Sequence, residues 1–274
     1  MIRGGSGTGP FNTDYNVKLF FFIITLLMVI WEFKKNNKRE YIGLLITGAL
    51  MWGLAELFLQ LSKTRDFIPV SLFGVDLPFI IQICIQGVVE GAFVAIFCMF
   101  FSDRIIFIEY KKEDDGKNKR RLFSIVFIIL MGLLIIDALK YGIQTPDYGG
   151  DVPSRRSMFE PIPLTFLAIM VVIDLIFLIR ASSYYKKKGL YMTLLMIVFG
   201  AVWTIGEYIA GTRWIEIGIE GATNHAPPLV EFLALAFDII IEIALAYLPF
   251  LAIPYFLVYH KPEIIFGLSS VFLC

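Results

Sequence analysis

The sequence predicts an all-α integral membrane protein with seven transmembrane helices, its N-terminus outside and its C-terminus inside. Three observations lead to this fold class. Of the 274 residues, 58% are hydrophobic, whereas soluble domains have roughly 45–50%. Several apolar runs exceed the roughly 18 residues that mark a membrane-spanning helix. Basic residues gather in every second connection between these runs.

Seven apolar runs, each bounded by charged residues, glycine or proline, define the expected helices. They cover residues 17–33, 41–62, 77–101, 122–140, 162–180, 189–211 and 228–258. The last run is long enough that we expect a kink at Pro249 and Pro254. No connection is long enough to form a separate domain, so we expect one membrane domain over residues 1–274.

Lysine and arginine indicate the direction of the helices, because they stay on the cytoplasmic side of a membrane. The segments "KKNNKRE" (34–40), "YKKEDDGKNKRR" (110–121) and "YYKKKG" (184–189) follow the first, third and fifth helices. The other connections are richer in glycine and proline, as in "TPDYGGDVP" (145–153). We therefore expect an integral protein of the cell membrane with its C-terminus inside.

The chain also carries an internal repeat. The segments "WGLAE" (52–56) and "WTIGE" (203–207) each place a glutamate four residues after a tryptophan. Further on, "VVEGAF" (88–93) aligns with "IIEIAL" (240–245). The glutamates of these segments are 34 positions apart in the first copy and 35 in the second.

This match predicts two three-helix units, at residues 17–109 and 162–260, joined by a connector helix at 122–140. A single connector helix gives both units the same orientation in the membrane. The layout resembles that of the SWEET sugar transporters, whose parallel repeats are related by an axis along the membrane normal. The first two helices lack the prolines of the SWEET unit, so the resemblance is confined to the layout.

Carboxylates are the unusual residues of these helices. Lys18 and Lys140 lie at helix ends, and no lysine, arginine or histidine is expected deep in a span. An ionised side chain at the bilayer centre costs roughly 2.5–3.5 kcal/mol. The acids should therefore be protonated, face a water-filled cavity or bind a cation. They are Glu56, Glu90, Asp137, Asp174, Glu207, Glu231, Asp238 and Glu242.

Helical spacing places most of these acids on polar stripes that we expect to face one cavity. The third helix enters from outside near Leu77, so Glu90 lies about 20 Å down, near the midplane. Glu242 lies at a comparable depth on the seventh helix. We predict a vestibule that opens to the outside and is floored by these two residues. The candidate ligand-binding residues are Glu90, Glu242, Asp238, Glu56, Glu207, Gln86, Gln82, Trp52 and Trp203.

Structural roles compete with these assignments. Glu90 and Glu242 can act as neutral acids that hydrogen-bond between helices. Trp52 and Trp203 can serve packing alone, because a duplicated unit repeats its packing too. Asp137 has Lys140 three residues later and is expected to form an interfacial ion pair. The sequence indicates no role for Asp174.

Transport is the function that these features favour first. Two carboxylates that lie close together cannot easily both ionise, so one holds a proton near neutral pH. Such a pair can exchange a proton for a cation, the usual coupling device of secondary carriers. We expect a small proton- or cation-coupled carrier, or a channel, rather than an enzyme.

The expected partners are the lipid bilayer and a small cation, a proton or a lipid ligand. Three cysteines and two histidines form no recognisable metal or disulfide framework, so we expect no cofactor and no metal. We expect no nucleic-acid partner. The sequence does not decide whether the protein forms a homo-oligomer.

An intramembrane enzyme acting on an isoprenoid or another lipid is the alternative. A protonated acid among aromatic side chains can protonate an alkene, and the aromatic faces stabilise the resulting cation. The segment "APPLVEFL" (226–233) resembles the Pro-x-Glu-Glu segment of membrane lycopene cyclase domains, with Val230 in place of the first glutamate. The catalytic residues would then be Glu90, Glu242, Asp238 and Glu231.

A seven-helix receptor is a minor alternative. The segment "SDRI" (102–105) ends the third helix where receptor-type seven-helix proteins carry Asp-Arg-Tyr, and it resembles that motif at Asp103 and Arg104. The internal repeat and the absence of a cysteine at the outer start of the third helix argue against it.

Overall fold

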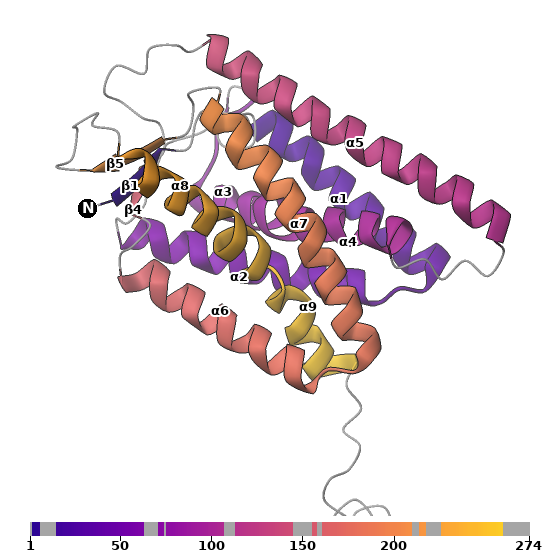
Figure 1. Cartoon of the computed structure of the whole chain (residues 1–274). Coiled ribbons are helices and arrows are strands. Elements are labelled where there is room, and N and C mark those ends of the chain that lie inside the picture. The colour runs from indigo at the N-terminus through magenta and orange to yellow at the C-terminus, as the bar shows by residue number, and fades with distance from the viewer. Residues whose placement is uncertain are drawn as a thin grey trace, which may run out of the picture.

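A bundle of helices makes up most of the molecule (Figure 1). The structure is a computed structural model that describes residues 2–5, 15–62, 71–73, 75–106, 113–144, 155–157, 161–209, 214–217 and 226–259. The predicted all-α class is confirmed. Each of the seven predicted helical ranges contains a helical segment in the described part of the chain.

The first four of these segments are one helix each or a helix interrupted by one irregular turn. They are α1 (Tyr15–Asn36), α2 (Glu40–Leu61), the continuous helix α3–η1–α4 (Phe79–Gln86, Gly87–Phe93 and Val94–Ile105) and α5 (Glu113–Gln144). The remaining three are α6 (Pro161–Arg180), α7 (Ser183–Ile209) and the last, interrupted helix. The last helix consists of α8 (Pro228–Phe237), η2 (Asp238–Leu245), α9 (Pro249–Pro254) and η3 (Tyr255–Tyr259).

Four helices are long and apolar enough to cross a membrane, among the residues the structure describes. They are Glu40–Leu61, Phe79–Ile105, Pro161–Arg180 and Ser183–Ile209. Their outward side chains are largely leucine, isoleucine and phenylalanine, such as Leu54 at 50% and Ile176 at 47% exposure. Apolar side chains on the outside of a helix bundle are what a lipid environment requires.

The last helix is interrupted where its prolines predict. A turn at residues 246–248 separates η2 from α9, which begins at Pro249. Pro254 lies inside α9, and the π-helical turn η3 follows it directly. Proline lacks the N–H that an uninterrupted helix needs at that position. The helical geometry therefore changes next to both prolines at which a kink was predicted.

Two π-helical segments, η1 and η2, lie in the middle of the third and the last helices. Glu90 lies in η1, and Glu242 lies in η2. A π-helical segment bonds each N–H to the carbonyl five residues earlier and often occurs at functional sites. Both glutamates that were predicted to lie near the midplane therefore occupy irregular helix turns.

Glycines bring α2 and η1 into backbone contact. A Cβ atom on Gly91 would lie 2.5 Å from the carbonyl oxygen of Gly48 and 2.5 Å from the Cβ of Trp52. A Cβ atom on Gly87 would lie 2.5 Å from the carbonyl oxygen of Ala49. Only glycine fits at such distances, so these positions set how closely the two helices approach.

The core lies where α4, α7, η2 and α9 meet, and α5 and α6 lie on opposite sides of it (Figure 1). Phe97 on α4 contacts Phe127 on α5 at a centroid distance of 6.0 Å and Phe199 on α7 at 5.9 Å. Phe177 on α6 contacts Tyr255 at 5.7 Å. Aromatic contacts thus connect both flanking helices to the centre of the bundle.

A small antiparallel sheet lies at one end of the bundle, beside the start of α8 (Figure 1). Its central strand β1 (Ile2–Gly5) pairs with β4 (Arg155–Ser157) and β5 (Trp214–Ile217), and Arg3 lies opposite both Ser157 and Glu216. The two-residue strands β2 (Ser71–Leu72) and β3 (Val75–Asp76) form a hairpin between α2 and α3. Apolar periodicity could not predict the three-stranded sheet, because its pairing is long-range.

Candidate functional site

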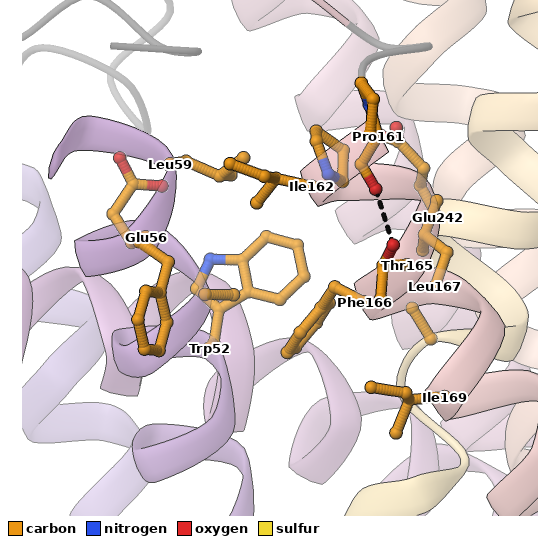
Figure 2. A pocket seen from close by; sticks show the side chains of 14 residues that line it. Trp52, Glu56, Leu59, Pro161, Ile162, Thr165, Phe166, Leu167, Ile169 and Glu242 are labelled. Atoms are coloured by element: carbon orange, nitrogen blue, oxygen red, sulfur yellow. Dashed lines mark hydrogen bonds between the residues drawn. The ribbon is translucent and has the colours of Figure 1, made fainter. Parts of the chain in front are cut away.

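A cavity of about 360 Å³ opens between α2, α6 and η2. Figure 2 shows the indole of Trp52 reaching from α2 toward Ile162 and Phe166 on α6. Small-molecule sites typically have volumes of about 300–1,000 Å³. Most of the lining is apolar or aromatic. The described residues that line it are Trp52, Ala55, Glu56, Phe58, Leu59, Pro161, Ile162, Pro163, Thr165, Phe166, Leu167, Ile169, Glu242 and Ala246.

Two carboxylates are the charged groups of this lining. Glu56 on α2 is 2% exposed and accepts a hydrogen bond from Nε2 of Gln60 at 2.6 Å. Glu242 on η2 is 8% exposed. Thr165 also lines the cavity, but its hydroxyl donates to the carbonyl oxygen of Pro161 at 2.7 Å (Figure 2). The cavity therefore offers an apolar volume with carboxylates on two of its three walls.

Trp52 connects the cavity to Glu90. Its indole N–H donates to Oε2 of Glu90 at 3.4 Å, and Nε2 of Gln86 donates to the same oxygen at 3.1 Å. The Tyr247 hydroxyl donates to the backbone carbonyl of Glu90 at 2.6 Å, and the Tyr247 ring lies 5.1 Å from that of Trp52. Glu90 is half-buried and does not belong to the cavity lining. Trp52 thus lines the cavity with its ring, while its N–H donates a hydrogen bond to Glu90.

Two other predicted ligand-binding residues, Asp238 and Gln82, and the candidate catalytic residue Glu231 lie in separate contacts. Thr204 donates to Oδ2 of Asp238 at 3.1 Å, and Tyr208 donates to Oε2 of Glu231 at 2.7 Å. Gln82 donates to the carbonyl oxygen of Leu77 at 2.9 Å.

The second copy of the tryptophan–glutamate motif also lies apart from the cavity. Glu207 is buried on α7, and the ring of Trp203 lies 5.9 Å from that of Phe199. Of the residues expected in one shared vestibule, the described cavity gathers Trp52, Glu56 and Glu242. The two copies of the motif therefore have different surroundings.

A second polar cluster lies at the other end of the helices, and sequence reasoning missed it. Lys188 on α7 is fully buried, forms an ion pair with Glu40 on α2 and lies 3.4 Å from Oδ2 of Asp103 on α4. Lys38 and Tyr41 also donate to this oxygen of Asp103, at 2.7 Å and 3.0 Å. The sequence interpretation left Lys188 in the connection before the sixth predicted helix, whereas it lies in the first two turns of α7.

Arg104 extends the same cluster to α1. Its guanidinium forms an ion pair with Glu32, donates to the carbonyl oxygen of Phe100 at 3.1 Å and lies 3.4 Å from the centre of the Phe100 ring. Glu32 has no exposed surface. We call Glu32, Lys38, Glu40, Asp103, Arg104 and Lys188 the inner charge cluster.

Helix ends explain why this cluster was missed. The third helix continues to Ile105 rather than ending at 101, and α7 begins at Ser183 rather than 189. These extensions place Asp103, Arg104 and Lys188 within helices, where they face acidic and basic side chains of other segments. The segment "SDRI" (102–105) was the one available signal, because it placed two opposite charges beside an apolar run.

Asp174 on α6 is the one predicted intramembrane acid with two unpartnered oxygens in the described part of the chain. It is 3% exposed, and neither carboxylate oxygen has a hydrogen-bond partner there. The side chains of Asp137 and Lys140 lie outside the described part of the structure, so their expected ion pair does too.

No group of three or more metal-ligating side chains is present among the described residues. The apolar and aromatic lining with two carboxylates suits an organic ligand that is held by apolar contact and by a carboxylate. Aromatic faces such as that of Trp52 also attract cations, by about 0.5–2 kcal/mol. No protein-family model, curated protein or solved structure matches this chain.

Proposed function

We propose that the protein is a membrane carrier for lipophilic organic cations, which bind in the cavity between α2, α6 and η2. The observation that supports this proposal is the apolar cavity with two glutamates in its lining. A hydrophobic cation can bury its body against Phe166 and Trp52 while its charge lies near Glu56 or Glu242. A buried carboxylate is expensive in an apolar site unless a positive charge or a proton neutralises it.

The position of the cavity on the bundle supports a ligand that arrives from the lipid. Phe58, Ile162 and Ile169 line the cavity and are 59%, 47% and 54% exposed. In a membrane, apolar side chains with such exposure face acyl chains rather than water. A lipophilic cation that is dissolved in the membrane can therefore reach the carboxylates between α2 and α6.

The full membrane arrangement belongs to this proposal. We infer that all seven helical segments span the bilayer, with the small sheet outside and the inner charge cluster at the cytoplasmic end. The basic connections at 34–40, 110–121 and 184–189 support this direction. We expect an impermeant maleimide to label Val75→Cys from outside intact cells and Lys187→Cys after permeabilisation only, in a protein whose own cysteines are replaced. The reverse pattern would contradict the orientation.

Two π-helical segments support the interpretation as a duplicated three-helix unit. The aligned segments "VVEGAF" and "IIEIAL" lie within η1 (Gly87–Phe93) and η2 (Asp238–Leu245). In each unit this irregular turn packs on the tryptophan-containing helix, η1 on α2 and η2 on α7. The same local geometry at equivalent positions is expected when one unit has been copied.

The binding experiment uses tetraphenylphosphonium, a lipophilic cation, with the purified full-length protein in detergent. Tetraphenylborate has nearly the same shape and the opposite charge, so it separates charge recognition from apolar partitioning. We expect the phosphonium to bind and the borate not to bind. Equal binding of both ions would contradict the proposal.

Two substitutions locate the binding site. Glu56→Gln and Glu242→Gln should each weaken phosphonium binding by about tenfold or more, which corresponds to about 1.4 kcal/mol. Glu207→Gln is the matched control, because Glu207 is buried at 4% exposure in the corresponding motif but lies outside the cavity lining. Uptake into proteoliposomes then tests whether the bound cation is carried and whether protons move with it.

An intramembrane lipid enzyme is the second candidate. The lateral position of the cavity suits an isoprenoid chain as well as a lipophilic cation, and Glu242 is the one proposed catalytic acid in its lining. Mass spectrometry of an isoprenoid mixture after incubation with the protein tests this candidate. A product that forms with the wild type and not with Glu242→Gln would favour the enzyme over the carrier.

A further inference from the structure

Asp174 is a buried acid that the proposed binding site does not use. Its side chain is 3% exposed, and neither of its oxygens has a hydrogen-bond partner among the described residues. Such groups are rare in folded proteins, and each requires an explanation. An isolated ionised carboxylate in apolar surroundings is so unfavourable that the group takes up a proton instead.

The surroundings of Asp174 are apolar on its own helix. Met170, Asp174 and Phe177 form the buried stripe of α6, and Met170 and Phe177 are both fully buried. Phe177 packs on Tyr255 and Phe256, with centroid distances of 5.7 Å and 6.3 Å. Asp174 therefore occupies a place where a hydrophobic residue would be expected.

The charged groups of the neighbouring segments are engaged elsewhere. α6 packs against α9, η2 and α2, and α9 (Pro249–Pro254) carries no titratable residue. On η2, Asp238 is bonded by Thr204 and Glu242 lines the cavity. The acids of α2 are held by Gln60 and Lys188, and Tyr41 donates to Asp103. Asp174 forms no ion pair with any basic side chain in the described part of the chain, including Arg180 and Lys188.

Asp174 lies on the same helix face as the cavity wall. Phe166, Met170 and Asp174 are spaced i, i+4 and i+8, so they form one stripe. Asp174 is about 12 Å farther along α6 than Phe166, which lines the cavity. The part of α6 that would contact the ligand and the part that buries the acid thus belong to one rigid helix.

We propose that Asp174 is a proton-binding site that couples the protonation of the protein to the position of α6. It holds a proton while α6 is packed as described, and it releases the proton when α6 moves and exposes the carboxyl group to water. This inference rests on the proposed function, because a ligand in the cavity stabilises the same packing of α6. Proton binding and ligand binding then strengthen each other, since coupling between two sites is reciprocal.

The coupling has a definite direction with pH. Raising the pH removes the proton, disfavours the described packing of α6 and weakens ligand binding. The wild type should therefore lose affinity for tetraphenylphosphonium at alkaline pH, by about fivefold or more. Asp174→Asn, which resembles the protonated acid in shape and charge, should keep its affinity there.

Dicyclohexylcarbodiimide tests the protonation directly, because it modifies protonated carboxyl groups in apolar surroundings. We expect peptide mass spectrometry of the wild-type protein in liposomes to find the modification on Asp174, and to find less of it as the pH rises. Asp174→Asn should remove this modification, and Asp174→Glu should restore it. Asp238, which is equally buried at 3% but hydrogen-bonded by Thr204, is the internal comparison.

The two measurements separate this inference from the proposed function. Labelling of Asp174 does not depend on any ligand, so it reports on the acid even if tetraphenylphosphonium fails to bind. An unlabelled Asp174 in folded protein would overturn the proton site. If Asp174→Asn loses affinity for tetraphenylphosphonium at alkaline pH as the wild type does, the coupling is overturned. The carrier proposal would still stand.

Discussion

The ammonium group of Lys188 is paired with the carboxylate of Glu40, which lies 148 positions earlier in the chain. The Lys188 side chain is fully buried, and that of Glu40 is 10% exposed. Removing one partner of a buried ion pair leaves the other charge unneutralised, which costs more than the pair itself contributes. This pair therefore connects α7 to α2.

Substitution of Lys188 by methionine should destabilise the protein. The change leaves Glu40 without its cation, whereas Asp103 keeps Lys38 at 2.7 Å. We expect the free energy of unfolding to fall by about 3–5 kcal/mol, measured by denaturant unfolding in detergent. Lys188→Met/Glu40→Gln should recover part of this loss. Lys187→Met is the control, because Lys187 lies on the same helix and is exposed. This change should alter the free energy of unfolding by about 0.5 kcal/mol or less.

Substitution of Gly91 by alanine should disturb the contact between α2 and η1. The new methyl group would lie 2.5 Å from both the Gly48 carbonyl oxygen and the Trp52 Cβ. We expect a loss of about 1–3 kcal/mol in the free energy of unfolding. Gly132→Ala on α5 should be neutral or stabilising, since a methyl group there would have no neighbour within 4 Å in the described part of the chain. Equal effects of the two changes would argue against close packing at Gly91.

Filling the cavity should block ligand binding without unfolding the protein. Ile162 lines the cavity and is 47% exposed, while Ile176 on the same helix is equally exposed and lies outside the lining. We expect Ile162→Trp to weaken tetraphenylphosphonium binding by about tenfold or more, because the indole occupies the ligand volume. Ile176→Trp should bind like the wild type. Thermal unfolding of both variants checks that the fold is intact.

Tryptophan fluorescence should report binding through Trp52 and not through Trp203, the tryptophan of the second tryptophan–glutamate motif. Trp52 lines the cavity, whereas Trp203 packs on Phe199 and does not belong to the lining. Addition of tetraphenylphosphonium should therefore change the emission of the wild type and of Trp203→Phe. The change should be absent from Trp52→Phe. A signal that depends on Trp203 would place the ligand beside Trp203 and outside the described cavity.

The helices themselves could be predicted from the sequence because their cause is local. An apolar run in a membrane must satisfy its own backbone hydrogen bonds, and a helix does so within the segment. The irregular geometry at Pro249 and Pro254 was predictable for the same reason. The ends were less predictable, since Lys188 and Asp103 look like loop residues until their partners are known.

The candidate site was predicted in part. Helical spacing selected Trp52, Glu56 and Glu242, and these residues line the cavity. It also selected Glu207 and Trp203, which lie elsewhere, because spacing shows which residues share a helix face but not what that face meets. The wall formed by α6, with Ile162 and Phe166, was not expected, since a run of apolar residues looks the same against lipid and around a ligand.

The sequence by itself determined the class of the protein, the place of its helices and the residues that are too polar for an apolar environment. These properties follow from transfer energies and hydrogen bonds within single segments. Only the tertiary structure decided that Lys188 meets Glu40, that α6 closes one wall of the cavity and that Asp174 has no partner among the described residues. Each of these depends on which helix faces meet, and that is set by close packing between segments far apart in the chain.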